Sequence, residues 1–379
     1  MGTISRKSKV ESRKSTSRIS RFSLGYFWQQ FKQWFRAKWW HKIIAVVVAA
    51  VMLFVSGMYG IAQWYIWQNR HTPVRIGATF IPNYAKYLDL DPKETLNAMI
   101  NDLGIQHLRL VSYWKDLERE PGQYDFSELD WQVDMADKAH VPVSLSLGLR
   151  QPRWPECHMP AWAEKLPKEA WQPELEKYIQ KVVERYKDRE IIESYQLENE
   201  FFLTVFGICP DFDRNRLIKE AELVKRLDPN RKLIITRSNN AMGLPIGQPR
   251  PDEFGVSVYK RVWDKSVTKR YYEYPLPAWF YASLAGAGKI ATGKDLIVHE
   301  LQAEAWMPDG FEIKTAPLEE LDKSMNPDRL HHRILYGIGT GMKTVDLWGV
   351  EWWYQMKTKR DSPDLWKTAK YEINKASKK

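Results

Sequence analysis

Residues 192–200 read IESYQLENE, a run with the length of a barrel strand that closes on a glutamate, Glu200. A second short apolar run, residues 296–300, reads LIVHE and also closes on a glutamate, Glu300. Both runs have the length and apolar content of buried strands. If they belong to one parallel barrel, the two carboxylates point into its mouth at the carboxyl ends of the strands, where active sites of that fold lie.

The region from Arg75 onward predicts one barrel, since its roughly 300 residues fall within the size range of that fold. Strands are predicted near residues 75–80, 107–111, 141–147, 192–199, 232–237, 254–258, 296–300 and 344–348. Helical patterns lie between and after them, at residues 92–103, 129–139, 173–186, 213–227, 277–287, 326–339 and 363–376, and the Gly- and Pro-rich residues 241–251 are expected to hold little helix. Short strands that alternate with helices predict a parallel sheet, and eight of them predict an α/β fold closed as a (β/α)8 TIM barrel.

The amino terminus predicts a membrane anchor. Residues 43–69 contain no charged side chain, and their apolar core of about 20 residues spans about 30 Å as a helix. Residues 1–42 hold 11 Lys or Arg against one acid, Glu11, while the whole chain has a net charge of +10, so the rest of the chain is neutral. This bias predicts a basic cytoplasmic tail (1–42), a transmembrane signal anchor with its interface (43–69) and an extracytoplasmic domain (75–379). Within the anchor, residues 43–66 are expected to cross the bilayer.

Other features of the amino terminus agree with a single-pass protein of the cell membrane. Aromatic residues mixed with Lys and Arg predict an amphipathic helix on the inner interface: Tyr26, Phe27, Trp28, Phe31, Trp34, Phe35, Trp39 and Trp40. A signal peptide cleaved near Gly60-Ile61-Ala62 is the alternative, but a 42-residue basic leader is long for one. Because the basic excess is confined to the tail, we expect no nucleic-acid binding by the folded domain.

Four motifs lie at or after predicted strands: LRL at 108–110, YWKDLEREPGQYDF at 113–126, NE at 199–200 and HELQ at 299–302. This ordered set resembles the second strand and its loop, the Asn-Glu acid/base pair of strand 4 and the strand 7 nucleophile of clan A retaining glycoside hydrolases. That clan includes cellulase, mannanase, β-xylosidase and β-galactosidase families. One departure is Phe201, which stands where the clan usually has Pro after the acid/base glutamate.

The resemblance implies a retaining β-glycosidase that acts on β-linked oligosaccharides, polysaccharides or glycoconjugates without a cofactor. Glu300 is then the nucleophile and Glu200 the acid/base, with carboxyl groups about 5–5.5 Å apart. Asn199 is expected to bind the sugar 2-hydroxyl. The nucleophile has to stay ionised, and Arg109, at the carboxyl side of the second strand, is the expected cation beside it.

Two aromatic residues complete the predicted substrate site. Tyr259, just past the sixth strand, is expected to donate a hydrogen bond to Glu300, and Trp348, at the end of the eighth, is expected to offer its face to the sugar. Packing is the alternative role for both, and an interior ion pair is the alternative for Arg109. Further stacking positions are predicted at Trp154, Trp306, Trp352 and Trp353.

Several alternatives remain open at this point. Glu304, in QAEAW, is the rival nucleophile, and Glu198 is expected to support the site rather than react. A non-catalytic carbohydrate-binding barrel, such as a surface lectin or adhesin, is the alternative function. A phosphate-binding barrel enzyme is disfavoured because no Gly-rich loop follows the last two strands. The His residues show no metal-ligand spacing, so no catalytic metal is expected.

The two cysteines of the chain, Cys157 and Cys209, fall in the loops after the third and fourth strands. Outside the membrane a disulfide between them is permitted, and we predict one. Two unpaired thiols are the alternative.

Overall fold

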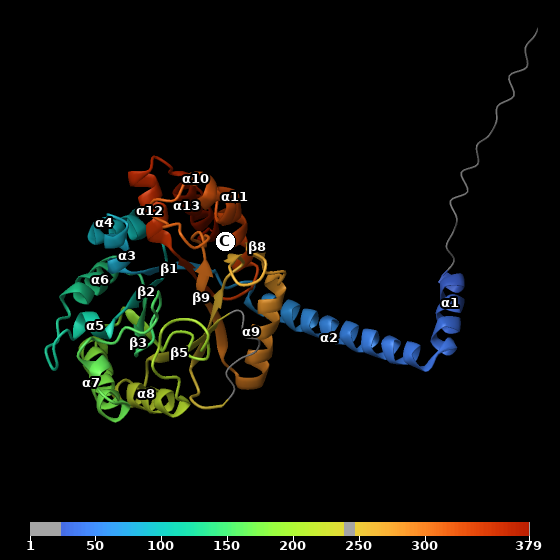
Figure 1. Ribbon diagram of the computed structural model, residues 1–379, viewed down its shortest axis with the longest axis horizontal. Coiled ribbons are helices and arrows are strands. Elements are labelled where there is room, and N and C mark those ends of the chain that lie inside the picture. The colour runs from blue at the N-terminus through green and yellow to red at the C-terminus, as the bar shows by residue number, and fades with distance from the viewer. Residues whose placement is uncertain (1–23, 239–246, 379) are drawn as a thin grey trace, which may run out of the picture. The chain divides into compact units, whose positions relative to one another are not determined.

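A computed structural model describes residues 24–238 and 247–378, and its centre is a closed barrel of eight parallel strands (Figure 1). Around the barrel the strands follow the order β1 (Arg75–Phe80), β10 (Thr344–Trp348), β9 (Asp295–Gln302), β6 (Glu253–Val258), β5 (Lys232–Ser238), β4 (Ile192–Leu197), β3 (Val143–Leu147) and β2 (Leu108–Val111), which closes on β1. The predicted (β/α)8 barrel is therefore confirmed.

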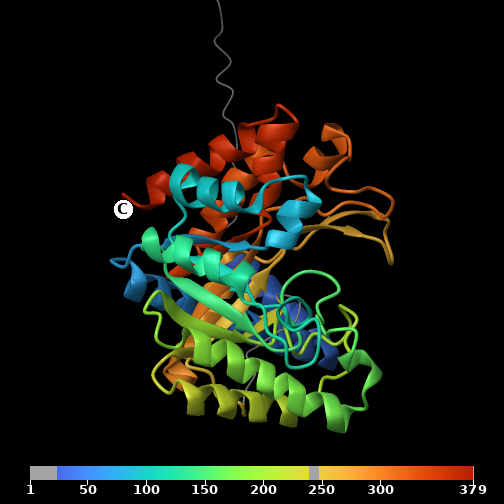
Figure 2. The same cartoon turned by 90° about the vertical axis from the view of Figure 1, so that its left-hand side faces the viewer.

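Helices coat the barrel, and each predicted helix has a counterpart. They are α3 (Pro82–Tyr87), α4 (Pro92–Asn97), η1 (Ala98–Leu103), α5 (Trp114–Leu117), α6 (Ser127–Lys138), η2 (Ala163–Lys165), α7 (Lys168–Tyr186), α8 (Arg214–Leu227), α9 (Ala278–Thr292), α10 (Leu318–Ser324), α11 (Pro327–Ile338), α12 (Val350–Lys359) and α13 (Asp364–Ala376). Polar side chains cap the N-termini of α4, α8 and α11, where Asp91, Asp213 and Asn326 each accept a hydrogen bond from a first-turn amide. Helices α7 and α8 lie side by side in both views (Figures 1 and 2).

An antiparallel hairpin outside the barrel was not predicted. It is formed by β7 (Arg261–Asp264) and β8 (Arg270–Glu273) in the segment between β6 and α9, and it pairs Arg261 with Glu273. In the Gly- and Pro-rich segment, residues 247–251 hold no helix, and the preceding residues lie outside the described part of the chain.

The barrel interior carries a polar cluster below the mouth. Asp346 of β10 lies 2.7 Å from Nδ1 of both His107 and His299, and all three side chains are buried. Gly77 makes room for this carboxylate, since a Cβ there would lie 2.2 Å from Asp346 Oδ1. The cluster fixes β9 next to Glu300, the residue that follows His299.

The chain divides into two compact units, residues 1–57 and 58–379. Helices α1 (Leu24–Ala37) and α2 (Trp39–Asn69) lie at the amino terminus, and among the described residues α2 alone is long and apolar enough to cross a membrane. Residues 58–69 of α2 belong to the barrel unit, where Ala62 and Tyr65 are buried. They pack closely on α9, because a Cβ on Gly286 would lie 2.7 Å from Ile61 Cγ2.

Candidate active site

The two predicted catalytic carboxylates come from β4 and β9, but neither is the last residue of its strand. Strand β9 continues past Glu300 to Gln302, whereas β4 ends at Leu197 and leaves Glu200 in the turn beyond it. The Glu200 amide donates to Thr236 Oγ1 at 2.9 Å, and its φ of 44° lies in the left-handed region. The expectation that each glutamate ends its strand was therefore wrong. The chain turns sharply after β4 and before Glu200, and β9 runs two residues past Glu300.

Glu300 is held by the two residues expected beside it. Arg109 Nη2 donates to Glu300 Oε2 at 2.8 Å, and the Tyr259 hydroxyl donates to Oε1. Arg109 also donates through Nη1 to the His299 carbonyl, so its guanidinium is fixed in orientation. A buried carboxylate with one donor on each oxygen, one of them a cation, has the partners that an anionic nucleophile needs.

Glu200 lies in the opposite electrostatic situation. Burial, together with the negative charges of Glu300 and Glu156, raises the pKa of Glu200 to about 8. The side chain is 5% exposed, so water does little to stabilise its charged form. Glu200 is therefore protonated near neutral pH and can donate a proton, while Glu300 has Arg109 and Tyr259 as donors.

A third carboxyl group, Glu156, was not predicted. Asn199 Nδ2 donates to Glu156 Oε2 at 3.0 Å, and Gln196 Nε2 donates to Asn199 Oδ1 at 2.9 Å. Burial raises the pKa of Glu156 to about 7. Asn199 directly precedes Glu200 in the chain, and its amide group already contacts the side chains of Gln196 and Glu156.

Trp348 lies at the end of β10, where its face is covered by a cation. The Arg153 guanidinium carbon is 4.5 Å from the Trp348 ring centre and 3.4 Å from that of Tyr84. The rival nucleophile Glu304 accepts from Arg153 Nη2 at 3.1 Å and from the Tyr84 hydroxyl at 2.7 Å. Neither Arg153 nor Tyr84 was predicted. The partners of Glu304 are thus Arg153 and Tyr84, whereas Arg109 and Tyr259 bind Glu300.

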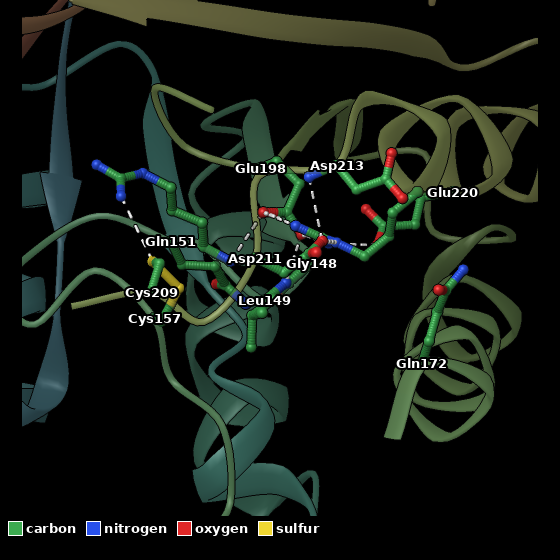
Figure 3. A network of polar contacts seen from close by, with 12 residues as sticks. Gly148, Leu149, Gln151, Cys157, Gln172, Glu198, Cys209, Asp211, Asp213 and Glu220 are labelled. Atoms are coloured by element: carbon green, nitrogen blue, oxygen red, sulfur yellow. Dashed lines mark hydrogen bonds and ion pairs between the residues drawn. A yellow bond between two sulfur atoms is a disulfide. The ribbon is translucent and has the colours of Figure 1, made fainter. Parts of the chain in front are cut away.

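The turn that carries Glu200 is built on the buried side chain of Glu198 (Figure 3). Glu198 accepts from the amides of Leu149 and Arg150 at 2.6 and 3.0 Å and from Arg216 Nη1 at 2.8 Å. Gly148 leaves space for it, because a Cβ there would lie 2.4 Å from Glu198 Oε1. The loop after β3 and the turn after β4 are therefore joined through one carboxylate.

Further contacts extend this network outward. Arg216 also pairs with Glu220 and with Asp211, and Asp211 accepts from Lys168 Nζ at 2.7 Å. Burial raises the pKa of Glu220 well above its ordinary value. The supporting role expected of Glu198 thus has a specific form: it holds the turn before Glu200 against α8.

Cys157 and Cys209 form a disulfide beside this network, with Cα atoms 5.2 Å apart (Figure 3). Arg150 Nη1 lies 3.4 Å from Cys209 Sγ, and Arg150 Nε donates to the Asn199 carbonyl at 2.6 Å. The bond joins the loop that carries Glu156 to the segment that follows Glu200.

The four further tryptophans divide into two groups. Trp154 and Trp306 are 58% and 37% exposed, and both contact the ring of Phe206. Trp352 and Trp353 are fully buried, and Trp353 Nε1 donates to the Ala303 carbonyl. The prediction of stacking positions at Trp352 and Trp353 was wrong, because both belong to α12 and pack in the core. Within residues 24–238 and 247–378, no group of three or more His, Cys, Asp or Glu is placed to hold a metal ion.

No protein-family model and no curated protein matches the chain. Solved structures with the same fold do. A GH5_18 protein from Streptomyces cattleya in complex with GlcNAc has a TM-score of 0.55 at 13% identity, with 81% of each chain covered. An endo-β-1,4-xylanase of glycoside hydrolase family 10 from Gloeophyllum trabeum has a TM-score of 0.52 at 13% identity, covering 79% of this chain and 96% of that one.

A β-galactosidase from Halorubrum lacusprofundi has a TM-score of 0.54 at 13% identity and covers 80% of this chain, which spans only 58% of that protein. The chain thus has the barrel fold of clan A glycoside hydrolases, which include GH5 and GH10. At these identities the likeness concerns the fold, and the chemistry has to be argued from the residues of the site.

Proposed function

We propose that this protein is a membrane-anchored retaining glycoside hydrolase that cleaves β-linked sugars outside the cytoplasm. The observation that carries the proposal is the pairing of two unlike glutamates. Glu300 is bound by Arg109 and Tyr259, whereas burial and the neighbouring charge of Glu300 raise the pKa of Glu200 to about 8. An anion next to a protonated carboxyl is the arrangement that double displacement requires.

In the first step a Glu300 oxygen attacks the anomeric carbon, the bond to the leaving oxygen breaks, and the Glu200 proton passes to that oxygen. In the second step Glu200, now a carboxylate, takes a proton from water as the water oxygen attacks the anomeric carbon. The glycosyl–Glu300 bond breaks, and both glutamates return to their starting states. Tyr259 and Arg109 stabilise the Glu300 carboxylate when it departs.

The substrate class rests on similarity and on the aromatic residues of the mouth. One solved neighbour was crystallised with GlcNAc and another with Manβ1-4GlcNAc. The second ligand contains a β-linkage. The exposed Trp154 and Trp306 offer ring faces of the kind on which sugars stack, whereas Arg153 covers the ring of Trp348. We therefore expect a β-glycoside, with the mouth open to more than one sugar unit.

The location rests on the sequence of the amino terminus. Residues 1–42 carry the whole basic excess, and the apolar helix α2 follows them. By the positive-inside rule, the tail then lies in the cytoplasm and the barrel on the far side of the membrane, where a Cys157–Cys209 disulfide is stable.

The test is hydrolysis of a panel of aryl β-glycosides by the wild-type chain and two variants. Glu300→Gln should lower the rate by roughly 10⁴-fold or more and prevent labelling by a 2-deoxy-2-fluoro glycoside, detected by intact mass. Glu200→Ala should remain active on substrates with good leaving groups and gain rate with azide. Full activity of Glu300→Gln would contradict the assignment and redirect attention to Glu304.

A non-catalytic carbohydrate-binding barrel is the second candidate, because two substrate-binding groups of the mouth already have protein partners. Glu156 accepts from Asn199, and Arg153 covers the ring of Trp348. In this case sugars would bind to the wild-type protein in calorimetry but no aryl glycoside of the panel would be cleaved. Hydrolysis by the wild type, together with sugar binding but no hydrolysis by Glu300→Gln, would instead support the enzyme.

A further inference from the structure

A cavity lies outside the barrel wall, lined by residues that follow β6, by the β7–β8 hairpin and by α11. Its volume is about 300 Å³, and its charged lining residues are Lys260, Arg329, Arg333, Glu273 and Asp328. We call it the basic pocket. Its volume lies at the lower end of the range of small-molecule sites.

The basic pocket is lined by three Lys or Arg side chains and two acids, Glu273 and Asp328, so its cations are in excess. Arg329 and Arg261, a neighbour on β7, approach the same carboxylate oxygen, Glu273 Oε2, at 3.6 and 3.7 Å. These separations exceed a hydrogen bond, so both ion pairs are weak. Glu273 is also about half exposed, which weakens its field through solvent screening.

Arg333 is the buried cation of the pocket. It is 5% exposed, its Nη1 donates to Gln302 Oε1 at 2.9 Å, and it forms no ion pair with any residue in the described ranges. A neutral amide compensates a buried charge poorly. Burial is the main cause that lowers the pKa of Arg333 to about 10; the charge of Glu273 opposes this shift, and the charges of Arg329 and Arg261 add to it.

Lys260 adds a third charge with neutral partners. Its Nζ donates to the carbonyls of Tyr274 and Leu276 at 2.5 and 2.9 Å. Burial lowers the pKa of Lys260, and the charge of Arg333 lowers it further. Three cations thus face one cavity with mutual repulsion that a bound anion would relieve.

We propose that the basic pocket binds a phosphate-type oxyanion. Two guanidinium groups and an ammonium converge from α11 and from the end of β6, which suits the several terminal oxygens of a tetrahedral anion better than the two of a carboxylate. The cavity also exceeds the space that a single phosphate fills, so the anion enters as part of a larger molecule or with water. A phosphorylated sugar, a phospholipid headgroup and free phosphate share this chemistry.

The pocket is connected to the catalytic pair through Gln302. Gln302 Oε1 accepts from Arg333 and from the amides of Lys260 and Arg261, both at 2.9 Å. Gln302 follows Glu300 by two residues on β9, and Lys260 follows Tyr259, the donor to Glu300. An anion on Arg333 therefore acts on the same short segments that hold the nucleophile.

The test is titration calorimetry of the full chain in neutral detergent with inorganic phosphate. Saturable binding to one site is expected. Arg329→Gln should weaken it by about tenfold, the loss of one charge-assisted hydrogen bond. Arg333→Gln should weaken it at least as much. Arg189→Gln, which removes a surface arginine paired with Asp134 and Asp137, is the matched control and should bind as wild type.

Arg329→Gln keeps the proposal testable if Arg333→Gln fails to fold, because Arg329 is 35% exposed and does not contact Gln302. Separate titrations with a hexose 6-phosphate and with dioctanoyl phosphatidic acid identify the source by whichever binds most tightly. The absence of saturable binding for all three ligands, or equal binding by wild type, Arg329→Gln and Arg333→Gln, would overturn the proposal. Neither result depends on whether the barrel hydrolyses glycosides.

Discussion

The guanidinium of Arg109 lies against the carboxylate of Glu300, with Nη2 2.8 Å from Oε2, and both side chains are almost fully shielded from water. Charges exert their strongest influence where water is excluded. The same exclusion that strengthens this ion pair also leaves the neighbouring Glu200 protonated. Exclusion of water thus has different consequences for a carboxyl group with a cationic partner and for one without.

We expect the rate of glycoside hydrolysis to fall as the pH rises through about 8. The pKa of Glu200 is raised to about 8, so the proton donor is present below that pH and lost above it. The measurement is kcat/KM against pH for an aryl glycoside with a poor leaving group. Glu156→Gln removes one of the charges that raises this pKa and should move the alkaline limb to lower pH. An unchanged alkaline limb in Glu200→Ala would assign the titration to another group.

Arg216→Met should lower the free energy of unfolding by about 3–5 kcal/mol, because the buried side chain of Glu198 loses its cation and that of Glu220 loses its hydrogen-bond donor. Thermal or denaturant unfolding of the purified chain measures the loss. Lys177→Met, which removes an exposed partner of Glu174, is the control and should change stability by less than about 1 kcal/mol. Equal stability of both variants would mean that the network adds nothing to the fold.

Replacing Cys157 and Cys209 by serine should lower the free energy of unfolding by about 4 kcal/mol, the loop-closure value for their sequence separation of 52. Activity should fall as well, since the loop with Glu156 and the segment after Glu200 lose their link. Thermal unfolding with and without reductant compares the two forms. Two thiols that titrate in the unfolded, unreduced wild type would show that the bond does not form in the isolated protein.

Deleting residues 1–57 should leave a folded, monodisperse barrel, whereas deleting residues 1–69 should destabilise it. The longer deletion removes the buried side chains of Ala62 and Tyr65 and uncovers Gly286 on α9. Burial of this size contributes roughly 3 kcal/mol. Gel filtration and melting temperature of the two truncated chains test the difference. Two equally stable truncations would show that residues 58–69 are dispensable to the barrel.

The barrel was predictable because its strands are buried on both faces and therefore read as short apolar runs between amphipathic helices. Glu300 and Tyr259 lie at or just beyond the end of such a run, and Arg109 lies within β2. Their chain positions placed them at one end of the barrel, and the resemblance to clan A glycoside hydrolases supplied their expected roles.

Residues on irregular loops could not be found in this way. Arg153 and Glu156 have φ values of 81° and 74°, and their loop follows a path set by the disulfide and by contacts with distant residues. No periodicity marks such positions. The turn after β4 was missed for a related reason, because Glu198 and Glu200 adopt left-handed backbone conformations that their residue type does not favour.

The close approach of Gly148 to Glu198 has a consequence for the history of the protein. A methyl group at position 148 would overlap the carboxylate, and a shorter side chain at position 198 would release Leu149, Arg150 and Arg216 together. Neither position can change first without passing through a damaged intermediate. Descendants of this sequence are therefore expected to keep both residues or to have exchanged both, which makes the pair a marker for tracing relatives that share this construction of the acid/base turn.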